Sequence, residues 1–147
     1  MSVSFSDVRV VARAAVVLVW VRRSLRDSTY HEVRELLANR LSSDGEEAGN
    51  RDRFDEARRV GQLVNGVANK LPLDLNCVPR TLTTWYLLGR RGIIADMPIG
   101  VRTSEDSERV FHTWAEVNGI PVNDRRDVAT RYTLFGTDLA SVRRWEP

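Results

Sequence analysis

The chain has 147 residues, of which 42% are hydrophobic, and its formal net charge at pH 7 is +2. This size predicts one compact unit with a sizeable core. The small positive excess is not clustered, so the charge pattern of a nucleic-acid-binding protein is missing. The single cysteine, Cys77, cannot form an intramolecular disulfide, and no signal peptide is evident, so we expect a cytoplasmic protein.

The first helical pattern covers residues 7–23, with Ser6 as the expected N-cap. The face expected to be buried consists of apolar residues at helical spacing: Val8, Val11, Ala12, Ala15, Leu18 and Val19. The most apolar stretch, 14–21, is shorter than the roughly 20 residues that cross a bilayer. We therefore predict a buried helix here and no membrane partner.

Two further helical patterns follow. The second covers residues 29–41, with Ser28 or Thr29 as its cap, and the third covers residues 53–70. The faces expected to be buried are Val33, Leu36, Leu37 and Leu41 in the second helix, and Phe54, Ala57, Val60, Val64 and Val67 in the third. The polar stretch between them, 42–52, has little to bury and is predicted to be a mobile loop.

The second half of the chain opens at Leu71-Pro72, which ends the third helix. A fourth helix is predicted over 77–90, with Asn76 as its N-cap and Pro79 in its first turn. The pattern then becomes extended, and strands are expected at residues 93–102, 109–117 and 120–124, with 130–136 as an edge strand or a segment packed on the core.

These elements predict an α+β fold. Residues 1–70 form a helical N-terminal lobe, and residues 71–147 form a core with a Cys-bearing helix and a small antiparallel sheet. The two parts are expected to pack as one compact unit.

Cys77 lies where the predicted fourth helix begins, ahead of His112 and then Asp124 on the following strands. This order is typical of one class of papain-like and transglutaminase-like cysteine enzymes. A thiol attacks as a thiolate, which a helix N-terminus and a protonated histidine both favour. We therefore predict Cys77 as the nucleophile, with its backbone N–H as one oxyanion donor, His112 as the acid–base residue and Asp124 as the carboxylate that orients the ring.

The third member depends on the hairpin at Asn118-Gly119. A three-residue loop, 118–120, places Asp124 on the face of His112, whereas a strict two-residue turn places it on the opposite face. Pro121 disfavours ordinary ladder pairing beside the turn, so we predict the longer or bulged loop. With a strict two-residue turn, Asn123 would be the better third member.

Each candidate also has a structural interpretation. A lone Cys is most often a buried small hydrophobic residue. His31, the other histidine, lies in a polar helix and is expected to be solvated. Trp114 belongs to the core or to the wall of a substrate groove; it and Asn76 are candidate substrate-binding residues. One Cys and two distant His give no zinc signature, and no glycine-rich phosphate loop is present, so neither metal nor cofactor is expected.

Residues 77–124 resemble the transglutaminase-like leader peptidases of lasso-peptide biosynthesis. That family has a Cys-x-Pro-Arg-[Ser/Thr]-Leu helix start, here residues 77–82, and a Leu-Leu…Arg-Arg-Gly-Ile helix end, here 87–93. An Ile-Gly-Val strand follows at 99–101, then His-x-Trp-x-Glu-Val-x-Gly at 112–119, and after it an Asp. The order and spacing of these motifs are specific.

The resemblance implies a transglutaminase-like or papain-like core, and a cysteine peptidase that cuts the leader from a ribosomally made precursor peptide. It implies a separate leader-recognition protein, since the chain begins directly with the helical segment, and an ATP-using macrolactam cyclase that acts on the freed core. It also implies a small specificity pocket near Cys77 for the Thr that commonly precedes the last leader residue.

Two other functions stay open on the sequence. One is a non-enzymatic module that docks a peptide or the cyclase and carries a vestigial transglutaminase-like site. The other is acyl transfer to an amine instead of water, as in true transglutaminases. The distance between the Cys77 sulfur and a His112 ring nitrogen separates the docking module from an enzyme.

Overall fold

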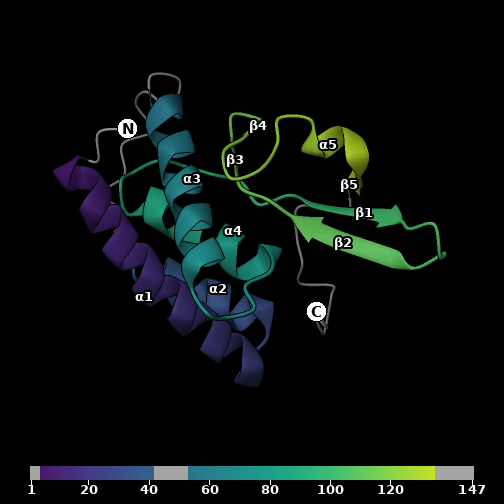
Figure 1. Cartoon of the computed structure of the whole chain (residues 1–147), viewed down its shortest axis with the longest axis horizontal. Helices are drawn as coiled ribbons and strands as arrows, with labels where there is room; N and C mark the ends of the chain where they lie inside the picture. The colour runs from purple at the N-terminus through teal and green to yellow at the C-terminus, as the bar shows by residue number, and fades with distance from the viewer. Residues whose placement is uncertain (1–3, 42–52, 135–147) are drawn as a thin grey trace.

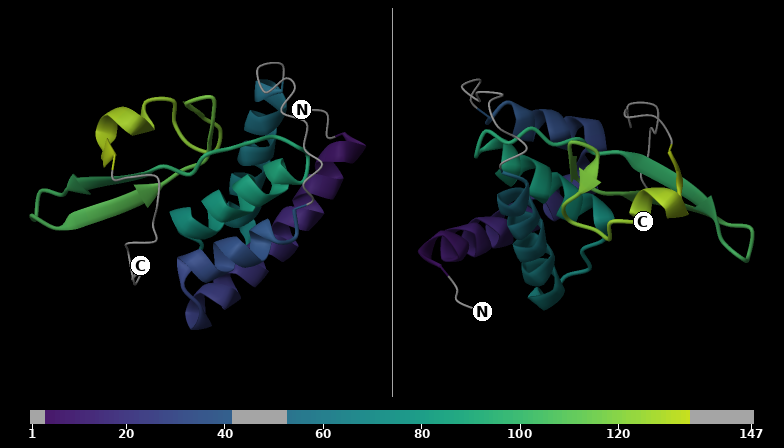
Figure 2. Two further views of the ribbon diagram at one scale, coloured as in Figure 1. Left: turned by 180° about the vertical axis from the view of Figure 1, so that it is seen from behind. Right: turned by 90° about the horizontal axis from the view of Figure 1, so that it is seen from above.

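The computed structural model describes residues 4–41 and 53–134. Helices α1 to α4 gather on one side of the molecule, and a β-ribbon projects from the other (Figure 1). Both further views in Figure 2 show the ribbon pointing away from the helices. The elements are, in chain order, α1 (Phe5–Asp27), α2 (Tyr30–Ala38), α3 (Phe54–Lys70), α4 (Cys77–Gly89), β1 (Ile99–Thr103), β2 (Arg109–Thr113), β3 (Glu116–Val117), β4 (Ile120–Pro121), α5 (Val128–Arg131) and β5 (Thr133–Leu134).

The first two helices begin at capping boxes. In α1 the Ser4 side chain accepts a hydrogen bond from the Asp7 backbone N–H, and the Asp7 carboxylate accepts one from the Ser4 backbone N–H. The predicted cap at Ser6 is therefore wrong, since the chain supplies a complete box two residues earlier. In α2 the cap is Thr29, one of the two residues expected there.

The buried face of α1 differs from the predicted one. Its buried apolar residues are Val10, Ala14, Leu18 and Val21, which face α3 and α4. Of the predicted face only Leu18 is buried, and Val8 and Val11 are exposed. Since α1 carries apolar residues on two faces, helical spacing alone does not select the one that packs. In α2, similarly, Val33 and Leu37 are buried but Leu36 is exposed.

One hydrophobic cluster joins the helices to the chain that follows them. It includes Val10 and Leu18 of α1, Val64 of α3, Leu82 of α4 and Val122 beyond β4. The predicted α3 face is confirmed, with Ala57, Val60 and Val64 buried and Phe54 and Val67 packed against the cluster. No helix in the described ranges, 4–41 and 53–134, is long and apolar enough to cross a membrane.

The strands form two small antiparallel sheets. The first has the order β2-β1-β5, and the second pairs β3 with β4. Ile99 pairs with Thr113 at the buried end of the β1–β2 ribbon, whereas the Thr103–Arg109 pair at the other end is exposed. The ribbon is thus anchored at the end that lies nearest to the helices.

Several predicted strands are shorter than expected. The first begins only at Ile99, after Pro98, and the predicted strand 109–117 is divided into β2 and β3 by Trp114 and Ala115. The predicted strand 120–124 keeps only its first two residues as β4. Residues 133–134 form the expected edge strand on β1, while 135–136 and the predicted loop at 42–52 lie outside the described residues.

Candidate active site

Cys77 is the first residue of α4, as the sequence predicts. The Asn76 side chain caps the helix by accepting a hydrogen bond from the Val78 N–H at 3.2 Å. Arg80 donates from Nε to the Leu75 carbonyl at 2.9 Å and from Nη2 to Asn69 Oδ1 at 2.8 Å. The arginine of the helix-start motif therefore fixes the chain as it enters Cys77, and the thiol stays partly exposed.

His112 lies on β2, directly opposite Gly100 of β1. Its ring stacks on Tyr132, with the centroids 5.1 Å apart and the planes at 27°. A Cβ on Gly100 would lie 2.3 Å from the Tyr132 Cβ, so any larger residue would displace the tyrosine. The glycine of the Ile-Gly-Val motif thereby lets Tyr132 support the imidazole, a role that sequence reasoning did not find.

Asp124 contacts His112 directly. The His112 Nε2 and the Asp124 Oδ2 lie 2.5 Å apart, and the two side chains are 24% and 23% exposed. The other carboxylate oxygen accepts a hydrogen bond from the Arg125 backbone N–H at 2.7 Å. Because Nε2 is bound to Asp124, Nδ1 is the ring nitrogen left for Cys77, which acts as a further hydrogen-bond and charge partner of the ring.

The charges around His112 favour its protonated form. Burial lowers the pKa of the imidazole, but hydrogen bonds and charge from Asp124 and Cys77 outweigh burial and raise its pKa to about 9. Burial likewise raises the pKa of Asp124, but the hydrogen bonds from His112 and from the Arg125 backbone lower it by more. The site therefore holds an imidazolium beside a carboxylate at neutral pH.

The hairpin turn differs from the prediction. Glu116 pairs with Pro121 and Val117 with Ile120, which leaves a strict two-residue turn at Asn118-Gly119. Both turn residues have positive φ, 51° and 78°, as a type I′ turn requires. Pro121 is tolerated because its pair with Glu116 lies between the hydrogen-bonded pairs, where no N–H is needed. The predicted three-residue loop is therefore wrong.

The inference that a two-residue turn would favour Asn123 is wrong as well. The ladder ends where the Val122 N–H donates to the Ala115 carbonyl at 2.9 Å, and Asp124 lies beyond it in a bend. Facing rules for a continuous strand do not apply to a residue that has left the ladder. Asp124 reaches His112 from this bend, not from a strand position.

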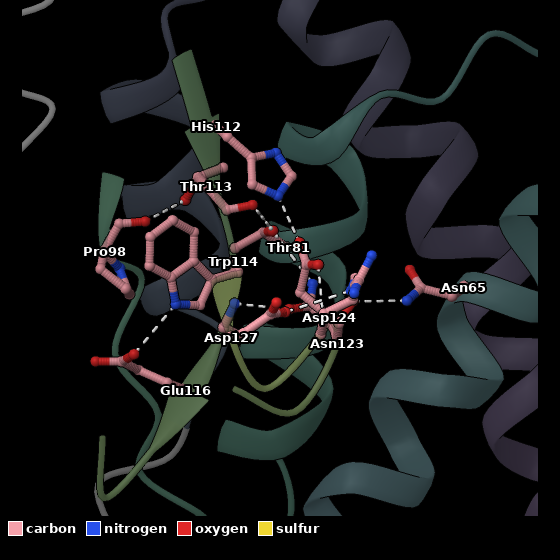
Figure 3. Close-up of polar contacts among 12 residues, drawn as sticks. Asn65, Thr81, Pro98, His112, Thr113, Trp114, Glu116, Asn123, Asp124 and Asp127 are labelled. Atoms are coloured by element: carbon pink, nitrogen blue, oxygen red, sulfur yellow. Dashed lines mark hydrogen bonds and ion pairs between the residues drawn. The ribbon is translucent and has the colours of Figure 1, made fainter. Parts of the chain in front are cut away.

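Asn123 holds the surrounding chain together (Figure 3). Its Oδ1 accepts from the Ala115 N–H at 2.8 Å, and its Nδ2 donates to Thr81 Oγ1 at 3.2 Å. The Thr81 hydroxyl in turn donates to the Thr113 carbonyl at 3.1 Å. This buried network joins α4 to the residue that follows His112 and to the residue that precedes Asp124.

Helix α3 forms the wall behind this segment. Asn65 donates from Nδ2 to the Asn123 carbonyl at 2.7 Å, and Arg58 donates from Nη1 to the Pro121 carbonyl at 3.2 Å. Between them, a Cβ on Gly61 would lie 2.2 Å from the Val122 carbonyl oxygen. A glycine inside a helix costs about 1 kcal/mol relative to alanine, so its presence there indicates a packing reason. Gly61 was therefore the signal in the sequence for this close approach of another backbone.

Trp114 is fully buried, with 0% exposure. Its indole Nε1 donates to Glu116 Oε2 at 3.1 Å, and its ring lies within 5.9 Å of the His112 ring and 6.2 Å of the Tyr132 ring, measured between centroids. This position favours the core interpretation of Trp114 over a groove wall. His31 is exposed and pairs with Glu35 at 3.1 Å, as expected for a solvated histidine.

The residues that the structure describes offer no cluster of metal ligands. Among residues 4–41 and 53–134, no group of three or more His, Cys, Asp or Glu side chains could hold a metal ion.

Comparison with known proteins identifies a family. The profile described as the transglutaminase-like superfamily matches residues 14–136, which is most of the chain and includes Cys77, His112 and Asp124. Searches of the curated proteins and of the solved structures found no match. On the extent of the profile match, the chain belongs to the transglutaminase-like superfamily.

Proposed function

We propose that this protein is a cysteine peptidase that removes the leader from a ribosomally made lasso-peptide precursor. The observation that carries the proposal is the His112 ring, which has Asp124 on Nε2 and Cys77 as its other partner. Superfamily membership supports cysteine chemistry at this position. The lasso-peptide substrate rests on the resemblance of the motifs at 77–82 and 112–119.

The proposed reaction follows from the order of the three side chains. The Cys77 thiolate attacks the carbonyl carbon of the leader–core junction and forms a C–S bond. The C–N bond then breaks, and the imidazolium of His112 gives its proton from Nδ1 to the leaving amine. His112 next takes a proton from water as the water oxygen attacks the thioester carbon. The C–S bond breaks, which restores the Cys77 thiolate beside the His112 imidazolium, and the leader leaves as a carboxylic acid that loses its proton to solvent. Asp124 orients the ring and stabilises its positive charge.

A backbone donor is available for the oxyanion. The Asn76 side chain accepts a hydrogen bond from the Val78 N–H, so the N–H of Cys77, the first residue of α4, is available as a donor. This donor lies on the nucleophile itself, so it is close to the carbonyl oxygen when the C–S bond forms.

The partners are part of the same proposal. The precursor peptide is delivered by a separate leader-recognition protein, and the freed core amine is closed onto an acidic side chain by an ATP-using cyclase. A small pocket near Cys77 accepts the Thr that precedes the last leader residue.

The proposal is tested by incubating the protein with a lasso-peptide precursor, with and without a leader-recognition protein, and following the products by mass. Cys77→Ala and His112→Ala should each abolish cleavage, while each variant still unfolds in one cooperative thermal transition. His31→Ala is the matched control, because this exposed histidine lies outside the site, and it should cleave normally. Cleavage by Cys77→Ala would refute the assignment of Cys77 as the nucleophile.

Product masses also separate the other functions. A leader with a free carboxylate supports hydrolysis, whereas a leader bearing an added amine supports acyl transfer. If the wild type bound the precursor but failed to cleave it both with and without the recognition protein, the result would support a docking module. The His112–Asp124 contact favours an enzyme instead.

A further inference from the structure

A cavity lies at the other end of α4 from Cys77, where the first turns of α1 meet the last turn of α4. Its volume is about 320 Å³. Four arginines line it, together with apolar side chains from both helices. The residues that matter here are Arg9, Arg13, Arg90, Arg91, Phe5 and Leu87.

The positive charge around this cavity is only partly balanced. Arg91 pairs with Glu56 at 2.8 Å. Arg9 lies over the Phe5 ring, 5.6 Å from its centroid. Within the described ranges, Arg9, Arg13 and Arg90 form no ion pair. Three guanidinium groups around one hollow favour a ligand with more than one negative charge.

The same hollow is lined by apolar side chains as well. Phe5 and Leu87 belong to its lining, and the Phe5 side chain is 79% exposed. A ligand that covers this aromatic ring with an apolar group removes its surface from water, which stabilises the complex. A ligand that carries both carboxylates and an apolar side chain would satisfy both features, and an acidic peptide has that chemistry. An inorganic anion would leave Phe5 exposed.

The position along α4 relates this cavity to the proposed active site. Arg90 follows Cys77 by thirteen residues, which corresponds to about 20 Å at 1.5 Å per residue. An extended peptide covers that distance with about six residues, and a path over the surface needs more. One peptide can therefore occupy both places.

We propose that this cavity is an exosite that binds an acidic segment of the substrate peptide, with one apolar side chain placed against Phe5, at least about six residues from the scissile bond. The inference rests on the proposed function for the identity of the peptide. The exosite itself is independent of the chemistry at Cys77, so the two can fail separately.

Binding is tested by fluorescence anisotropy with a labelled synthetic peptide, Glu-Glu-Leu-Glu-Glu-Leu. The double variant Arg13→Gln/Arg90→Gln should weaken binding by about fivefold or more at low salt, since each exposed ion pair contributes up to roughly 1 kcal/mol. Arg23→Gln is the matched control, because this exposed arginine of α1 does not line the cavity. A peptide with Gln for Glu, or with Ser for Leu, should bind the wild type more weakly.

Several results would overturn the exosite. One is that the wild type and the double variant bind the peptide equally well. Another is that the protein binds vesicles that contain phosphatidylglycerol but does not bind the peptide. A gain in affinity on Glu46→Gln/Glu47→Gln would assign the arginines to the chain's own acidic stretch. With the precursor as substrate, the double variant should raise KM and leave kcat unchanged, whereas Cys77→Ala should abolish turnover and leave peptide binding intact.

Discussion

The two sides of the active site are held by different forces. Cys77 is fixed locally, by the Asn76 cap, the Arg80 hydrogen bonds and the apolar packing of α4. Asp124 is fixed from a distance, by buried hydrogen bonds that cross from α3 and α4 to the segment after β4. The position of Cys77 therefore depends on the local capping and packing of α4. The position of Asp124 depends on how well α3, α4 and the segment after β4 pack together.

The largest effect should come from the contact between α3 and this segment. Gly61→Ala places a Cβ only 2.2 Å from the Val122 carbonyl oxygen, so it should destabilise the fold by roughly 3 kcal/mol and move Asp124 away from His112. Gly66→Ala on the same helix has open space and should stabilise the fold by about 0.5–1 kcal/mol. Urea unfolding of both variants measures the difference, and equal effects would contradict the close approach.

The next effect concerns the charge on His112. Asp124→Asn should lower kcat/KM by about 100-fold, within the range for general acid–base catalysis. It should also move the alkaline limb of the pH–rate profile down from about pH 9, because the carboxylate is one of the groups that raise the pKa of the ring. Asp127→Asn is the matched control: Asp127 pairs with Arg125 and Arg131 at the surface, and its loss should leave the limb in place.

The same pKa sets a stability effect of defined sign. The pKa of His112 is raised above its ordinary value of about 6.5, so the protonated ring stabilises the fold fully below that pH. This contribution is lost as the pH rises toward about 9. Asp124→Asn should make the unfolding free energy less dependent on pH over this window, and an unchanged dependence would contradict the assignment.

The smallest effect should come from the aromatic support of His112. Tyr132→Leu removes the stacked ring and should lower kcat by about threefold, since an aromatic pair contributes about 0.5–1.5 kcal/mol. Tyr132→Phe retains the ring and should behave as wild type, because the aromatic ring is the part of Tyr132 that stacks on the imidazole. A loss as large in Tyr132→Phe as in Tyr132→Leu would show that stacking is not what positions the imidazole.

The sequence predicted what depends on local signals. Helix α4, its cap at Asn76 and the place of Cys77 follow from residues that adjoin one another, and they were found correctly. The two-residue turn at Asn118-Gly119 also has a local signal, but Pro121 was given too much weight against it. A proline is excluded only where the ladder needs its N–H, and that depends on which pairs are hydrogen-bonded.

What the sequence did not reveal is decided by packing between distant elements. The buried face of α1 was predicted wrongly because two of its faces are apolar and only the neighbouring helices select one. The link from Asn65 to Asn123 spans 58 residues, and nothing in either stretch alone indicates the other. Asp124 follows the His-bearing strand in chain order, and this order identified it correctly. The facing rule for strands did not, because Asp124 contacts His112 from a bend beyond the ladder.

The Asn65–Asn123 contact bears on how this protein could be dissected. A fragment that starts at residue 71 would retain Cys77, His112 and Asp124, and by its sequence it would still look like a complete enzyme. It would have lost the glycine and the amide against which the Val122 and Asn123 carbonyls rest. The helical half therefore belongs to the catalytic unit. It contributes no side chain to the reaction, but it determines the position of Asp124.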